Sequence, residues 1–211
     1  QQAINDLVAR HESLRTRFAA ATPHALQLID AELKVPLQVA DLRQNDAASL
    51  QVRLEQLVRE PFDLATGPLL KAHLLELGTH ENALLIMTHH IISDNWSSKV
   101  LMRDLQLFYA ARCAGSAAAL PALPVQYGDY AIWQRDWLNG GELERQLTYW
   151  KDQLADAPTV LDIPTDRPRP PVATSNGGHV WWQLPKTTTR ELRQLAQAEG
   201  CTLFMLLIAV Y

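Results

Sequence analysis

Two largely apolar runs separated by a short polar turn constrain the fold of this chain most. Residues 69–77 and 83–89 flank the sequence Gly-Thr-His-Glu-Asn at positions 78–82. Runs so rich in apolar residues suit strands that are covered on both faces, and the intervening residues favour a hairpin turn. We therefore expect residues 83–89 to form a central strand of a sheet and to lead directly into a polar loop.

Helices are predicted on both sides of this hairpin, because apolar residues recur there at helical spacing. Shorter apolar stretches at residues 25–29, 35–39 and 178–184 have the pattern of strands. The expected helices are residues 4–18, a segment capped by Asn45 or Asp46 and ended by Pro61, a long segment from the loop at 93–95 to Gly115, and residues 130–138, 142–154, 189–198 and 202–211, the last of them fully buried.

A proline-rich segment divides the chain. Five of the 12 prolines fall within residues 158–171, where they exclude a helix interior or a central strand, so this segment is expected to be a crossing linker. The elements before it predict a layered α/β domain, and those after it the start of a second lobe. Residue 1 is Gln and the chain stops inside an apolar run, so we expect a piece of a longer protein.

Charge and cysteine content exclude several functional classes. Nineteen Lys and Arg against 23 Asp and Glu leave a net charge of −4, so neither nucleic acid nor an anionic membrane surface is an expected partner. The run at 203–211 is too short to span a bilayer, and the N-terminus lacks a signal-peptide pattern. Cys113 and Cys201 fit no disulfide framework or zinc motif, so we expect a cytoplasmic protein without a metal site.

Residues 89–94, with the sequence His-His-Ile-Ile-Ser-Asp, are the strongest local candidate for chemistry. Two imidazoles end an apolar strand, and Asp94 follows His90 by four positions. An imidazole has an ordinary pKa of about 6.5 and can exchange a proton near neutral pH once its orientation is fixed. A loop between a strand and a helix is a suitable place for such a group.

A structural interpretation of the same residues competes with the catalytic one. Adjacent strand residues point to opposite faces, so His89 and His90 cannot both serve one site directly, and one is expected to be a buried, hydrogen-bonded histidine. Asp94 precedes a helix, where an aspartate commonly caps the free N–H groups. No third ligand spacing supports a metal site. The local pattern alone leaves both interpretations open.

Five sequence blocks, in order and covering nearly the whole chain, carry a family resemblance. The blocks are Arg10-His11-Glu12-x-Leu14-Arg15-Thr16-x-Phe18, Pro61-Phe62-Asp63-Leu64-x-x-Gly67-Pro68-Leu69-Leu70, His89-His90-Ile91-Ile92-Ser93-Asp94-x-Trp96-Ser97, Tyr127-x-Asp129-Tyr130-Ala131-x-Trp133-Gln134 and Leu161-x-x-Pro164-Thr165-Asp166-Arg167-Pro168-Arg169-Pro170. Together they resemble the condensation domain of nonribosomal peptide synthetases.

The resemblance implies a fold and a division of the chain. The family has two lobes, each similar to chloramphenicol acetyltransferase, with the active site in a channel between them. We therefore expect a two-layer α/β lobe whose mixed β-sheet is flanked by helices. Residues 1–157 are expected to be the first lobe, truncated at its N-terminus, residues 158–177 the Pro-rich crossing linker, and residues 178–211 the incomplete start of the second lobe.

The resemblance also assigns roles within the loop. His90 matches the second histidine of the family motif, which faces the condensing amine, and is the expected catalytic residue. His89, Trp96 and Ser97 belong to the same active-site loop as supporting residues. The family's structural aspartate falls on Asp94.

Two further positions qualify these roles. The resemblance implies an ion pair between Asp94 and Arg15, which would hold the loop. Asn95 stands where the family usually has Gly. Because Asn tolerates φ > 0 better than other non-glycine residues, we expect it to keep a left-handed turn. Its side chain adds bulk where a pantetheine arm would pass.

Amide formation between an acyl or peptidyl thioester and an aminoacyl thioester is the function that the resemblance implies. The domain itself would bind no cofactor, because its substrates arrive on the phosphopantetheine of donor and acceptor peptidyl carrier proteins. An adjacent adenylation domain is a further expected partner. The alternatives are a domain that modifies a tethered residue, for example by dehydration, one that transfers an acyl group to a free amine or alcohol, and a non-catalytic docking or recruitment platform. Intact His90, Asp94 and Arg15 argue against the last, and Asn95 argues weakly for it.

Overall fold

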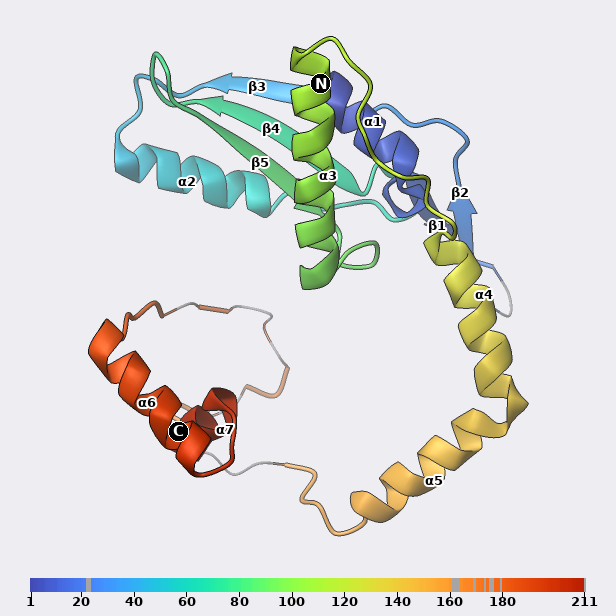
Figure 1. The fold of residues 1–211 in the computed structure, drawn as a ribbon, viewed down its shortest axis with the longest axis vertical. Coiled ribbons are helices and arrows are strands. Elements are labelled where there is room, and N and C mark those ends of the chain that lie inside the picture. The colour runs from blue at the N-terminus through green and yellow to red at the C-terminus, as the bar shows by residue number, and fades with distance from the viewer. Residues whose placement is uncertain are drawn as a thin grey trace. The chain divides into compact units, whose positions relative to one another are not determined.

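The computed structural model describes residues 1–21, 24–160, 164–168, 170–172, 174, 177, 178 and 180–210 (Figure 1). They divide into two compact units, Gln1–Asp156 and Ala157–Tyr211. The elements of the first unit are α1 Gln2–Arg10, a 3-10 turn Glu12–Arg15, β1 Thr16–Ala19, β2 Leu26–Ile29, β3 Leu37–Asp41, α2 Ala47–Val58, β4 Leu70–Glu76, β5 Asn82–Thr88, α3 Asn95–Cys113, α4 Tyr127–Trp137, a π-helical segment Leu138–Glu142 and α5 Leu143–Gln153.

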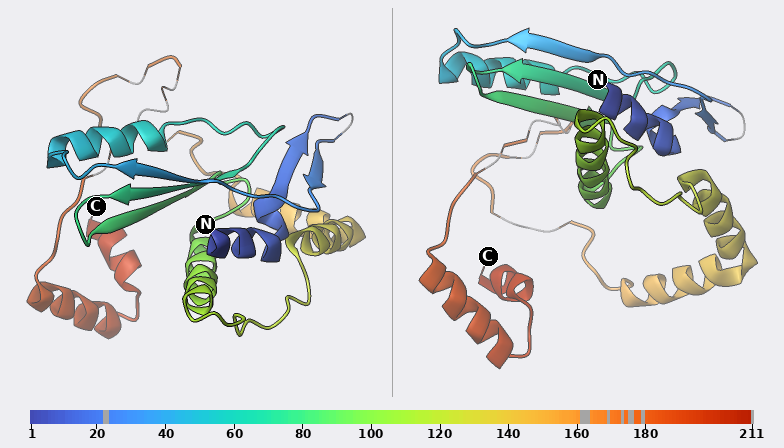
Figure 2. Two further views of the ribbon diagram at one scale, coloured as in Figure 1. Left: turned by 90° about the horizontal axis from the view of Figure 1, so that it is seen from above. Right: turned by 45° about the horizontal axis from the view of Figure 1, so that its top comes forward.

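A mixed sheet forms the centre of the first unit. Its strand order is β3-β4-β5, with β3 parallel and β5 antiparallel to β4. Helix α2 crosses over between the parallel strands and covers one face, while α1 and α3 lie against the other (Figure 2). β1 and β2 form a separate antiparallel pair. The predicted α/β lobe with a mixed sheet between helices is confirmed.

The main core lies between the sheet and the helices α1 and α3. Leu7 and Val8 of α1, Leu70 and Ala72 of β4 and Leu101 of α3 are all buried in one cluster. Leu75 has the opposite parity on β4, so it faces α2 and is buried there. The central strand is therefore β4, which is covered on both faces.

The predicted central position of residues 83–89 is wrong. Within the described sheet, β5 is an edge strand, and Leu84 on it is 43% exposed. An apolar run reports how much side-chain surface a strand can bury, but it does not identify which of two hairpin strands has neighbours on both sides. The parallel partner β3 pairs with β4, and this long-range pairing decides the order.

The first helix is shorter than predicted. Helix α1 ends at Arg10, and His11 is extended, with φ −106° and ψ 109°. Phe18, which continues the apolar spacing of the helix, belongs to β1, where its backbone N–H donates to the carbonyl of Leu64 at 2.7 Å. The spacing of apolar residues does not show where the helix ends. Residues beyond its end can still face the interior from a 3-10 or extended backbone.

The other predicted helices of the first unit are confirmed. Asp46 is the residue that caps α2, its carboxylate accepting from the Ser49 N–H at 2.8 Å. Between α4 and α5 the chain bends at Gly141, whose φ of 101° lies in the left-handed region that glycine adopts without a Cβ clash.

The second unit contains helices α6 Lys186–Ala198 and α7 Leu203–Val210. Both helices were predicted, but α7 is exposed rather than buried, with Phe204 72% exposed. The described residues of the range 178–184 form no strand, and the rest of the described unit offers no strand for them to pair with. Part of the predicted linker, including residues 161–163, lies outside the described residues, and the lobe boundaries stay a prediction. No described helix combines the length and apolarity needed to cross a bilayer.

Candidate active site

The two adjacent histidines have different surroundings. His89 follows β5 directly, and its backbone N–H donates to the Leu69 carbonyl at 3.0 Å. Its Nδ1 accepts from the Ile91 N–H at 3.0 Å, and its ring meets that of Phe62 edge-on at 6.0 Å. His90 is exposed to solvent. His89 is thus tied into the backbone turn, and His90 is free to meet a ligand.

His90 lines a cavity of about 390 Å³. The floor comes from residues 90–94 and from Ser97 on the first turn of α3. Ser13 of the 3-10 turn, Gln27 of β2 and Tyr127 at the start of α4 form the other walls. A concave site that gathers an imidazole and several hydroxyl and amide groups is the kind that binds and orients a polar substrate.

Asp94 is the N-cap of α3. Its Oδ1 accepts from the Ser97 backbone N–H at 2.7 Å and from the Ser97 hydroxyl at 2.6 Å. These hydrogen bonds, the hydroxyl bond foremost, lower the pKa of Asp94 below its usual value. Asp94 therefore fixes the junction between the histidine loop and α3 as an ionised carboxylate.

The predicted ion pair between Arg15 and Asp94 is wrong. Among the described ion pairs, Arg15 binds Glu12 at 3.1 Å, and Asp94 takes part in none. Arg15 also donates through Nη1 to the carbonyl oxygen of Asp30, the residue that follows β2. The counter-ion is supplied three positions earlier in the same 3-10 turn, so Arg15 braces that turn against β2 rather than the histidine loop.

Asn95 and Trp96 also differ from their expected settings. Asn95 is the first residue of α3, and no described non-glycine residue has positive φ, so the expected left-handed turn is wrong. The reason is the cap itself, because the residue that follows an N-cap must adopt helical φ and ψ. Trp96 is 76% exposed. Of the predicted supporting residues, Asp94 and Ser97 line the cavity with His90.

Substituting Asp94 separates a capping role from an ion-pair role. Asp94→Ala removes the acceptor of the Ser97 hydrogen bonds, and we expect the thermal midpoint to fall by about 2–4 °C. Asp94→Asn keeps a capping oxygen but removes the charge, so its midpoint should stay within about 1 °C of wild type. Calorimetry checks both values. Equal losses in the two variants would show that the charge, and not the cap, holds the loop.

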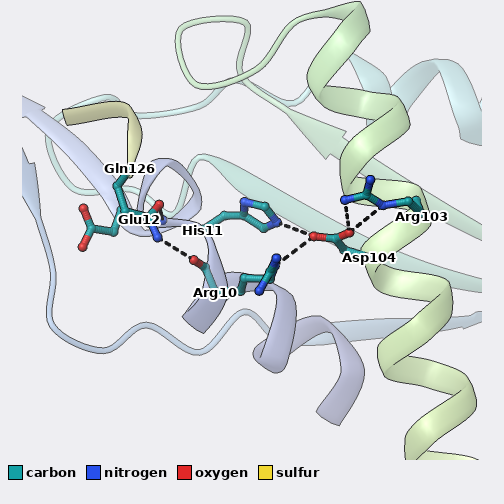
Figure 3. Close-up of polar contacts among 6 residues, drawn as sticks. All are labelled: Arg10, His11, Glu12, Arg103, Asp104 and Gln126. Carbon is teal, nitrogen blue, oxygen red and sulfur yellow. Dashed lines mark hydrogen bonds and ion pairs between the residues drawn. The ribbon is translucent and has the colours of Figure 1, made fainter. Parts of the chain in front are cut away.

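A buried carboxylate on α3 has a role that the sequence does not predict. Asp104 of α3 is fully buried, and its Oδ2 accepts from Arg10 Nε and His11 Nε2, both at 3.0 Å. Its Oδ1 accepts from Arg103 Nε at 2.9 Å and Nη2 at 2.7 Å (Figure 3). Burial raises the pKa of Asp104, but the hydrogen bonds from Arg103, His11 and Arg10 outweigh it and hold the pKa below its usual value. Nothing in the sequence near Asp104 signals this long-range role.

The protonation state of His11 follows from this cluster. Burial lowers its pKa more than the Asp104 carboxylate raises it, and the Arg10 and Arg103 guanidinium groups lower it further. An ionised carboxylate only accepts hydrogen bonds, so the neutral imidazole must carry its proton on Nε2. His11 thus donates to Asp104 without adding a third positive charge.

This arrangement makes stability depend on pH. Because the folded protein holds the pKa of His11 below its ordinary 6.5, the unfolded chain binds the proton more readily. The contribution of this group is complete above about pH 6.5 and is lost as the pH falls from there through the folded-state pKa. We expect the unfolding free energy of His11→Gln to fall less than that of wild type between pH 7 and pH 5, in urea titrations at each pH. Parallel curves for the two proteins would contradict this expectation.

Comparison with known proteins identifies the family. The model of the Condensation domain matches residues 1–211. Malpibaldin synthetase of Mortierella alpina is 42% identical over the whole chain, which spans 4% of that protein. Phosphinothricin tripeptide synthetase PhsC of Streptomyces viridochromogenes is 41% identical, and the chain spans 20% of it. The chain thus covers a small part of these curated relatives.

Solved structures agree with this result. The X-domain from teicoplanin biosynthesis superposes with a TM-score of 0.79 at 30% identity, over 95% of this chain and 45% of that one. The four-domain nonribosomal peptide synthetase AB3403 gives a TM-score of 0.81 at 25% identity, over 98% of this chain and 15% of that one. The fold, the ordered motifs and the full-length family match lead to one conclusion: the chain belongs to the condensation domain family of nonribosomal peptide synthetases.

Proposed function

We propose that this chain contributes the His90 side of an active site that joins two carrier-tethered thioesters through an amide bond. The observation that carries the proposal is the exposed residue His90, which lines a cavity at the junction of β5 and α3, with His89 held in the turn beside it. The donor is an acyl or peptidyl thioester, and the acceptor is an aminoacyl thioester.

The reaction balances without an added cofactor. The acceptor amine nitrogen attacks the donor carbonyl carbon, a C–N bond forms, and the C–S bond breaks to release the donor thiol. The nitrogen loses one proton, and the leaving sulfur gains one. Because a thioester is already activated, aligning the two reactants supplies most of the acceleration, up to about 7–11 kcal/mol.

His90 has a limited task in this scheme. A neutral imidazole can accept the proton of the attacking nitrogen, or it can stabilise the charged tetrahedral intermediate by a hydrogen bond. Both roles require a nitrogen lone pair or an N–H directed into the cavity. Asp94 supports either role by capping α3, and Ser97 completes that cap.

Phosphopantetheine enters as part of the substrates. It would bring each reacting group to the cavity from a donor or an acceptor peptidyl carrier protein, and an adenylation domain would load those carriers. We propose these three as partners and the cytoplasm as the location. Asn95, at the first turn of α3, is compatible with this function because its backbone is helical and needs no glycine.

One comparison favours a second candidate, a recruitment platform. The X-domain from teicoplanin biosynthesis, 30% identical to this chain, has a solved complex with OxyB. A platform would bind its partner without using His90. Modification of a tethered residue, for example by dehydration, is a third outcome that the same assay detects.

The test is a mass measurement of carrier-bound products. The full-length protein is supplied with a donor-loaded and an acceptor-loaded carrier, and a second reaction uses an acceptor whose amine is acetylated. We expect the donor acyl group to move to the free-amine acceptor alone. A loss of water on one carrier would favour tethered-residue modification, and unchanged carriers would favour the platform. Asn95→Gly should give the wild-type product.

A further inference from the structure

Three walls of the His90 cavity come from separate parts of the chain. Ser13 belongs to the 3-10 turn, Ser97 to the start of α3 and Tyr127 to the start of α4. Two sets of hydrogen bonds, called here the Asp104 knot and the Gln126 knot, connect these parts (Figure 3).

The Asp104 knot joins α3 to the end of α1. Ser97 and Asp104 are seven residues apart, about two helical turns, and lie on the same face of α3 as the buried Leu101. Asp104 binds Arg10, the last residue of α1, and His11, which precedes the 3-10 turn. The distance from the turn that carries Ser13 to the helix that carries Ser97 is therefore set by a fully buried carboxylate.

The Gln126 knot joins the same segment to α4. Gln126 Nε2 donates to the Arg10 carbonyl at 2.9 Å, and Gln126 Oε1 accepts from the Glu12 N–H at 3.2 Å. Gln126 is the N-cap residue of α4, and Tyr127 follows it directly. The Gln126 side chain thus binds the residues on both sides of His11. It holds the cavity wall that carries Tyr127 against the wall that carries Ser13.

We propose that Asp104 and Gln126 are positioning residues for the His90 reaction. They do not line the cavity themselves, and they act by holding α3 and α4 in register with the 3-10 turn. The inference rests on the proposed amide-forming function. A displacement of about 1 Å at a reacting centre can cost about 100-fold in rate, so a set of part-buried hydrogen bonds that fixes three walls controls catalysis without touching substrate.

The chain offers a matched control for Asp104. Arg112 binds Asp6 through two 2.7 Å hydrogen bonds, and this exposed pair also joins α3 to α1, but at the far end of α3 from the cavity. Asp6→Asn removes a carboxylate charge between the same two helices. Asp104→Asn removes the charge and one acceptor oxygen of the Asp104 knot, and Gln126→Leu removes both hydrogen bonds of the Gln126 knot. Gln126→Leu leaves the ion pairs of Asp104 in place, so it still tests the proposal if Asp104→Asn fails to fold.

The assay compares kcat per folded molecule in the full-length protein, with the folded fraction measured by circular dichroism at the assay temperature. We expect Asp104→Asn and Gln126→Leu to lower kcat 10- to 100-fold with KM for the acceptor carrier changed less than 3-fold. The double variant should be no more than about 3-fold slower than the worse single variant, because both act on one geometry. Asp6→Asn should stay within 2-fold of wild type.

Amide hydrogen exchange measures the order of the histidine loop without requiring the protein to form any product. Residues 89–98 should exchange faster in both knot variants and at the wild-type rate in Asp6→Asn. A kcat per folded molecule equal to wild type in both knot variants, or unchanged exchange in both, would overturn the positioning role. If wild type itself makes no amide, the proposed function fails, and exchange alone then decides the positioning role.

Discussion

Replacing His90 by alanine is expected to lower the rate of amide formation by about 100- to 10,000-fold, the usual contribution of a positioned acid–base group. His90 lines the cavity and is exposed, so the loss of its side chain should leave the fold intact. The thermal midpoint of His90→Ala should therefore match that of wild type. Single-turnover kinetics with preloaded carriers measures the chemical step.

His89→Ala is the matched control, because it removes the neighbouring imidazole from a structural position. It loses the acceptor of the Ile91 N–H and the edge contact with Phe62, so we expect a lower thermal midpoint. The rate per folded molecule should fall less than in His90→Ala. A His90→Ala protein within 3-fold of the wild-type rate would refute the catalytic assignment.

The second large effect concerns the centre of the sheet. Leu70→Ala on β4 should reduce the unfolding free energy by about 2–5 kcal/mol, because the side chain is fully buried between the sheet and the helices α1 and α3. Urea denaturation followed by tryptophan fluorescence measures the loss.

Leu84→Ala on β5 tests the strand order with the same substitution. Leu84 is 43% exposed on the edge strand, so we expect a loss of less than about 1 kcal/mol. Similar losses at Leu70 and Leu84 would indicate that β5 is as enclosed as β4 and would contradict the edge assignment.

Local pattern predicted much of the fold for a physical reason. The hairpin of β4 and β5 and the long helix α3 bury apolar side chains at the spacing set by their own backbone conformation. The sequence therefore shows these elements directly. Strand order carries no such local signal. The pairing of β3 with β4 joins residues more than 30 positions apart, and it alone makes β4 central.

The loop showed a similar division. Because side chains alternate along a strand, the sequence predicts different surroundings for His89 and His90. The position of Asp94 just before α3 likewise predicts its role as a helix cap. The expected ion pair of Arg15 with Asp94 does not form, because Arg15 binds Glu12 within its own turn and the carbonyl of Asp30 instead. The roles of Asp104 and Gln126 have no local signal, because the partners that connect them to residues 10–12 lie more than 90 positions away.

The most direct measurement is the position of the attacking nitrogen relative to His90. A crystal structure of the full-length protein with an acceptor pantetheine analogue, bearing a free amine and a non-hydrolysable linkage, would give this distance. We expect the amine nitrogen to lie about 3 Å from a ring nitrogen of His90. An amine bound more than about 6 Å from both ring nitrogens, with no bridging water, would contradict it.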